Sequence, residues 1–63
     1  MATMTKAERV RLVMSAEAAE AKARETGDRV HATMASAAYA ECERQGVTVA
    51  DIYDAWDAAR ASK

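Results

Sequence analysis

The side chains able to do chemistry are few in this chain of 63 residues, which has one histidine and one cysteine. His31 and Cys42 are eleven residues apart, so on one helix they return to the same face but lie about 16 Å apart along its axis. That separation is too large for one metal ion, and the chain has no further Cys or His to complete a zinc site. We therefore expect no metal ion and no cofactor. Cys42 is interpreted as a small buried thiol and His31 as a residue at the rim of a core.

Three aspartates, Asp51, Asp54 and Asp57, have the spacing i, i+3 and i+6, which suggests a metal or acid–base cluster. On a helix their directions spread over about 120°, and no polar neighbours in the sequence enclose them. A general acid or base needs a partly buried carboxylate with a shifted pKa. We expect a solvated acidic face instead. The chain also lacks a glycine-rich phosphate loop and a nucleophile motif. We therefore expect that it is not an enzyme and that it has no catalytic residue and no small-molecule substrate.

The elements that hold these side chains are predicted to be helices. Proline is absent, Gly27 and Gly46 are the only glycines, and helix-favouring residues dominate. The expected fold is all-α: a small three-helix bundle with helices at about 5–25, 28–45 and 49–61, as a monomer or as the subunit of a helical dimer. Residues 1–63 form a single helical domain, in which 1–4 are expected to be a loose N-terminus.

Capping signals support these boundaries. Thr5 and Glu8 form a capping box, and Asp28 can cap the second helix after Gly27. Gly46 suits the left-handed position after the second helix, and Thr48 with Asp51 is an aspartate version of the capping box at the start of the third. One glycine inside a helix costs only about 1 kcal/mol relative to alanine. A continuous helix from residue 5 to 45 therefore remains an alternative.

Apolar residues at helical spacing predict one buried face on each helix. In the third helix the apolar residues fall on one arc of roughly 160°, and the aspartates lie opposite. The expected inner face of the second helix consists of Val30, Met34, Ala35, Ala38, Tyr39 and Cys42. The expected core anchors are Val10, Met14, Val30, Met34, Ile52 and Trp56.

The composition bounds the stability and the partners of such a bundle. Alanine supplies 17 of the residues, and burial contributes only about 0.8 kcal/mol per methylene, so the core of a solitary monomer is thin. Self-association or binding to a protein partner would bury additional apolar surface, so we expect one of the two. The formal net charge of −1 argues against binding to nucleic acid or to an anionic membrane. The lone cysteine and the absence of a signal or membrane segment point to the cytoplasm of a bacterial or phage-infected bacterial cell.

Residues 38–57 carry a second pattern. The spacing is that of a helix-turn-helix. It consists of a small residue at Cys42, the turn pair Gly46-Val47, an apolar residue six positions after the glycine at Ile52, and the apolar pair Ala55-Trp56. This stretch resembles the bihelical unit of the phage repressor and Cro family. The resemblance implies a small DNA-binding regulator whose second helix presents Val49, Ala50, Tyr53 and Asp54 to the major groove.

The sequence departs from that family in two places. Gln45 stands where an apolar residue packs, and the second helix carries three aspartates before its first base, Arg60. Phosphates would repel those carboxylates. The preferred interpretation is a non-enzymatic helical interaction protein, phage-encoded, that serves as a regulator, adaptor or inhibitor through a protein partner or a homodimer. The residues expected to contact that partner are Tyr53, Asp51, Asp54, Asp57 and Tyr39.

Overall fold

The computed structural model describes residues 3–61, which form three helices: α1 (Lys6–Thr26), α2 (Arg29–Arg44) and α3 (Val49–Ala61). The predicted all-α fold is confirmed. The predicted boundaries of the first two helices differ from these by one residue at each end. Residues 1 and 2, part of the segment expected to be loose, lie outside the described range. Among the described residues, no helix combines the length and hydropathy that crossing a bilayer requires.

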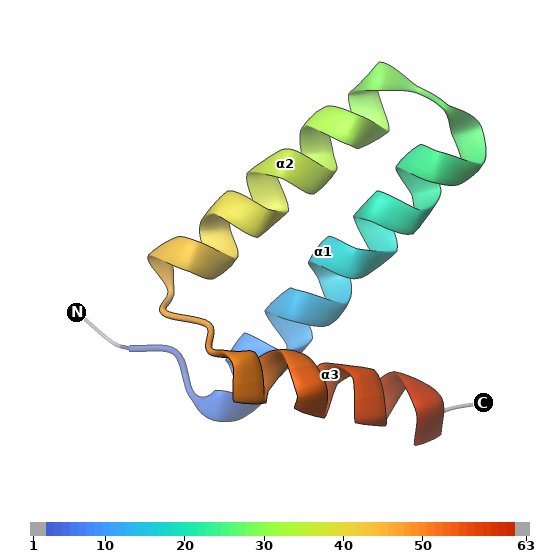
Figure 1. The fold of residues 1–63 in the computed structure, drawn as a ribbon. Helices are drawn as coiled ribbons and strands as arrows, with labels where there is room; N and C mark the ends of the chain where they lie inside the picture. The colour runs from blue at the N-terminus through green and yellow to red at the C-terminus, as the bar shows by residue number, and fades with distance from the viewer. Residues whose placement is uncertain (1–2, 62–63) are drawn as a thin grey trace.

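A sharp turn joins α1 to α2, so the two helices lie side by side and antiparallel (Figure 1). Gly27 adopts the left-handed conformation with φ 67°, and its N–H donates to the carbonyl of Ala23. The Asp28 carboxylate then accepts a hydrogen bond from the Val30 N–H at 3.0 Å. The predicted break at Gly27 is confirmed, and the continuous helix is excluded.

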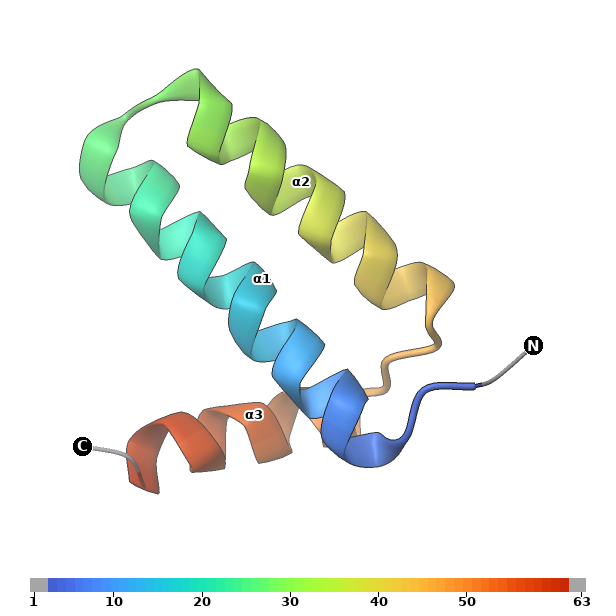
Figure 2. The same ribbon diagram turned by 180° about the vertical axis from the view of Figure 1, so that it is seen from behind.

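The second connection, from α2 to α3, contains Gly46 at φ 73°. The Gly46 N–H donates to the Glu43 carbonyl and the Val47 N–H to the Cys42 carbonyl, the two hydrogen bonds of a Schellman motif. Val47 also packs against the core cluster that contains Cys42. This turn directs α3 back across the N-terminal half of α1, and its C-terminal end extends away from the hairpin (Figure 2).

The core is small and rich in alanine. Val13, Ala16, Cys42 and Ala55 form its buried cluster, and Ala35 is also buried. Three of the expected anchors, Val10, Met14 and Ile52, are partly buried and pack against this cluster, as predicted. Leu12 packs against the cluster as well.

The expectation for the inner face of α2 is wrong in part. Val30 and Met34 are 63% and 55% exposed, so they do not anchor the core. The side of α2 that faces α1 contains Ala35 and Cys42, which are buried, and Ala38, which is half-buried, as predicted. The half-buried His31 completes this side, and the four residues have a 4-3-4 spacing. Small side chains allow α2 to lie close to α1, and this turns Val30 and Met34 outwards.

We predict that Ala55→Leu destabilises the fold, because Ala55 is completely buried where α3 packs on α1. Extra volume in such a contact costs about 1–3 kcal/mol in the free energy of unfolding. Urea denaturation followed by circular dichroism measures the effect. Ala59→Leu is the matched control, because Ala59 is exposed on the same helix and its change is expected to stay within about 0.5 kcal/mol. Equal effects of the two substitutions would contradict the packing described.

Candidate functional site

The N-terminal end of α3 is attached to α1 through a buried carboxylate. Asp51 is 1% exposed, and its Oδ2 accepts hydrogen bonds from the Thr48 N–H at 3.0 Å and from the Arg9 Nε at 2.8 Å. The Asp51 N–H donates in return to the Thr48 hydroxyl oxygen at 3.2 Å, which completes the predicted capping box. Lys6 Nζ lies 3.6 Å from the second carboxylate oxygen.

This arrangement corrects the expectation that Asp51 belongs to an outward acidic surface. The carboxylate lies between α3 and α1, so Asp51 is unavailable to a partner. Asp54 is half-buried and forms an ion pair with Lys6 at 2.7 Å, while Asp57 is exposed and pairs with Arg60 at 3.3 Å. The three aspartates therefore form no common face.

Arg9 is the residue that sequence reasoning missed here. It lies 42 positions from Asp51, among alternating charges that are typical of a solvated helix. In the structure its guanidinium also donates from an Nη to the Met4 carbonyl at 3.0 Å. No local signal in the sequence indicates this pairing, because it depends on how α3 crosses α1.

The electrostatic environment favours the ionised form of Asp51. The hydrogen bond from the Thr48 backbone and then that from Arg9 lower the pKa of this carboxyl from 3.8 to about 2. The hydrogen bond from Lys6 to Asp54 raises the pKa of Lys6, which favours the charged form of this ammonium group. Among the described residues, no buried side-chain nitrogen or oxygen lacks a hydrogen-bond partner.

The opposite side of α3 carries an exposed apolar surface. Val49, Tyr53 and Trp56 are 64%, 56% and 46% exposed, and we call these three residues the α3 ridge. The expectation that Trp56 anchors the core is therefore wrong. Because α3 packs through Asp51 and Ala55, only the edge of its apolar arc that contains Ala55 and Ile52 reaches the core.

The aromatic residues of the α3 ridge are held in place. The Tyr53 and Trp56 rings meet edge to face, with centroids 5.4 Å apart and planes at 76°. The indole N–H of Trp56 donates to the Glu17 carboxylate on α1. The ridge is consequently an ordered surface, and Tyr53, predicted as a contact residue, lies at its centre.

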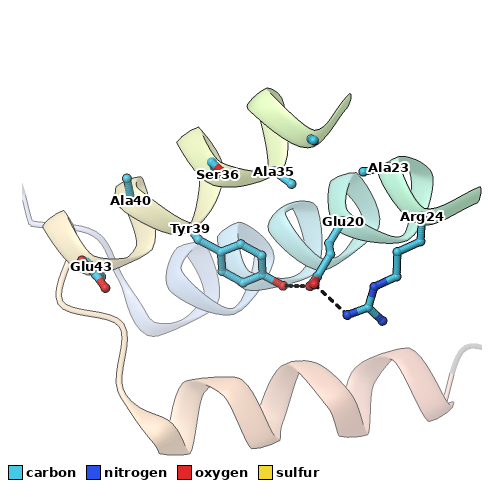
Figure 3. A pocket seen from close by; sticks show the side chains of 9 residues that line it. Glu20, Ala23, Arg24, Ala35, Ser36, Tyr39, Ala40 and Glu43 are labelled. Atoms are coloured by element: carbon cyan, nitrogen blue, oxygen red, sulfur yellow. Dashed lines mark hydrogen bonds and ion pairs between the residues drawn. The ribbon is translucent and has the colours of Figure 1, made fainter. Parts of the chain in front are cut away.

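A separate open groove of about 600 Å³ lies between α1 and α2 (Figure 3). Its lining consists of alanines and a few polar residues: Glu20, Ala23, Arg24, Ala32, Ala35, Ser36, Tyr39, Ala40 and Glu43. The Tyr39 hydroxyl donates to Glu20 at 2.7 Å, and Glu20 also accepts from Arg24 at 2.9 Å. Partial burial and then this hydrogen bond raise the pKa of Tyr39 to about 12.

The groove offers little chemistry of its own. The charged side chains of Glu20 and Arg24 satisfy each other, and Tyr39, 38% exposed, uses its hydroxyl within the same network. Cys42 is buried as predicted, and burial raises the pKa of its thiol, which leaves it in the unreactive protonated form. Within residues 3–61, no three His, Cys, Asp or Glu side chains come together as a metal site.

The geometry of residues 38–57 bears on DNA binding. α3 packs on α1, and no Cα atom of α2 comes within 8 Å of one in α3 in the described part of the chain. The two helices of a helix-turn-helix are adjacent in space. Of the four side chains that the resemblance presents to DNA, Val49 and Tyr53 are apolar and exposed, and Asp54 forms an ion pair with Lys6.

Comparison with family models, curated proteins and solved structures found no match for this chain.

We predict that Asp51→Asn lowers the melting temperature more than Asp57→Asn does. The first substitution removes the charge that pairs with Arg9 and Lys6 in a buried position, whereas Asp57 is solvated. The Asp57 variant is expected to remain within about 4 °C of the wild type, and the Asp51 variant to fall outside that range. Thermal unfolding followed by circular dichroism gives both values, and similar values would show that Asp51 does not hold α3 in place.

The same carboxylate predicts a pH dependence. Its pKa is lower in the folded chain, about 2, than the ordinary 3.8, so its contribution to stability is complete above about pH 4 and is lost as the pH falls towards 2. The difference in unfolding free energy between the wild type and Asp51→Asn should therefore shrink over this interval. Urea denaturation at a series of pH values measures it, and a difference that stays constant down to pH 2 would contradict the assignment.

Proposed function

We propose that this chain is a non-enzymatic protein-interaction module that contacts its partner through the α3 ridge. It acts as a regulator, adaptor or inhibitor by presenting a helical surface, without chemistry of its own. The single observation that carries the proposal is the exposure of Val49, Tyr53 and Trp56 together on one face of a helix whose other face is docked.

The physical properties of the α3 ridge support this function. Tyr and Trp are enriched among the residues that carry most of the binding energy at protein interfaces. The edge-to-face contact of Tyr53 with Trp56, and the hydrogen bond from Trp56 to Glu17, restrict both side chains before a partner arrives. Less conformational entropy is then lost on binding.

DNA binding is the weaker candidate. The net charge is −1, and Arg9, one of the cations that a DNA-binding surface would use, is engaged by Asp51 and by the Met4 carbonyl. Placing α3 in a major groove would bring Asp54 and Asp57 close to phosphates. No observation on the described residues favours this function over protein binding.

Site-specific photo-crosslinking tests the proposal. A photoreactive phenylalanine derivative is introduced at Tyr53 in one variant and at Met34 in another, and each chain is expressed in its native cells. Both positions are apolar, helical and about equally exposed, at 56% and 55%, so Met34 is a matched control on α2. We expect defined protein adducts from position 53 that position 34 does not give.

The outcome that overturns this function is equally specific. If position 53 yields no more protein adducts than position 34 does, the α3 ridge is not a binding surface. Circular dichroism of both variants establishes that they remain helical, which separates loss of binding from loss of fold.

A further inference from the structure

The molecule exposes more surface than a compact protein of the same mass. Its solvent-accessible area is 4700 Å², whereas a compact monomer of 6.8 kDa exposes about 3,950 Å². The excess, about 750 Å², is close to the roughly 800 Å² that each partner loses in a standard interface. The flat shape, with Cα extents of 33 × 32 × 16 Å, accounts for the excess. Binding one further protein through an interface of ordinary size would bring the exposed area of this chain to the value usual for its mass.

The α3 ridge has the spacing of a helix-pairing seam. Val49, Tyr53 and Trp56, followed by Arg60, are separated by four, three and four residues, the repeat at which two helices interlock side chains along their length. Resting on the proposed function, we infer that the partner at this surface is a second copy of the same chain. The two α3 helices pair in antiparallel orientation about a two-fold axis.

The core explains why the partner is a second copy. The buried hydrophobic residues among 3–61 are one valine, one cysteine and three alanines, which provide little burial energy for a folded monomer. A chain with such a core needs its exposed apolar ridge covered from the time it folds. A second copy is available in every cell that makes the first.

Charge selects the antiparallel orientation. A parallel pair would place the Arg60 side chains of both copies, each 76% exposed, at the same end of the seam. In the antiparallel pair centred between Tyr53 and Trp56, Arg60 of each copy lies beside Val49 of the other. The same alignment places Tyr53 of one copy beside Trp56 of the other, and the opposed helix dipoles favour it.

Sedimentation equilibrium of the full chain over a range of concentrations tests the dimer. We expect the wild type to approach twice the monomer mass, and Tyr53→Glu to weaken the dimer at least about 30-fold. Met34→Glu, which introduces the same charge at an equally exposed position on α2, should associate as the wild type does. A monomeric wild type, or a Tyr53→Glu variant that dimerises normally, overturns the inference.

The orientation is tested by disulfide formation in a Cys42→Ala background. Chains with Val49→Cys are mixed with chains with Arg60→Cys under mild oxidation, and the antiparallel pair predicts an excess of the mixed dimer over both homodimers. An excess of homodimers overturns the antiparallel pairing. If the wild type is monomeric while position 53 still crosslinks to another protein, the self-pairing fails and the proposed interaction function stands.

Discussion

The position of α3 depends on the carboxylate of Asp51. This group caps its own helix, accepts a hydrogen bond from Arg9 and faces Lys6, all while 1% exposed. A buried charge is tolerated only when paired and hydrogen-bonded, so the side chain has to point at the N-terminal turns of α1. This requirement fixes the rotation of α3 about its axis. Ala55, one turn later, then falls on the same side and brings the two helices close together.

The rotation divides the apolar arc of α3. Ile52 reaches the core, whereas Val49, Tyr53 and Trp56 remain at the surface. Burying an indole would hold α3 farther from α1 than the contact through Ala55 allows, because the facing part of α1 is built from Val13 and Ala16. Full burial of a large apolar side chain is worth about 1.5–3 kcal/mol, and the monomer forgoes part of this at each of the three positions. Such a conflict between the pattern of a helix and its use in the fold is typical of functional surfaces.

The parts of the structure that the sequence predicts are those whose partners are near in the chain. Both glycine turns, the Thr5 and Thr48 capping boxes and the Asp28 cap join residues within five positions of one another, and each is found as expected. Which portion of an apolar face meets a neighbour is not predictable in this way. It depends on the opposing surface, and alanines on every side of α2 leave its rotation weakly specified. The α3 ridge and the Arg9–Asp51 pair were not predictable for this reason, because both depend on how α3 packs against α1.

In the proposed function, the α3 ridge would also link folding to binding. A core made largely of alanine keeps the three helices close together but supplies little hydrophobic stabilisation. A partner that covers Val49, Tyr53 and Trp56 binds the folded chain and not the unfolded one, so it shifts the folding equilibrium towards the folded state by mass action. The edge-to-face rings and the anchor at Glu17 prepare this surface in advance. The exposed ridge that adds little to the stability of the isolated chain is therefore the same feature that would allow a partner to stabilise it.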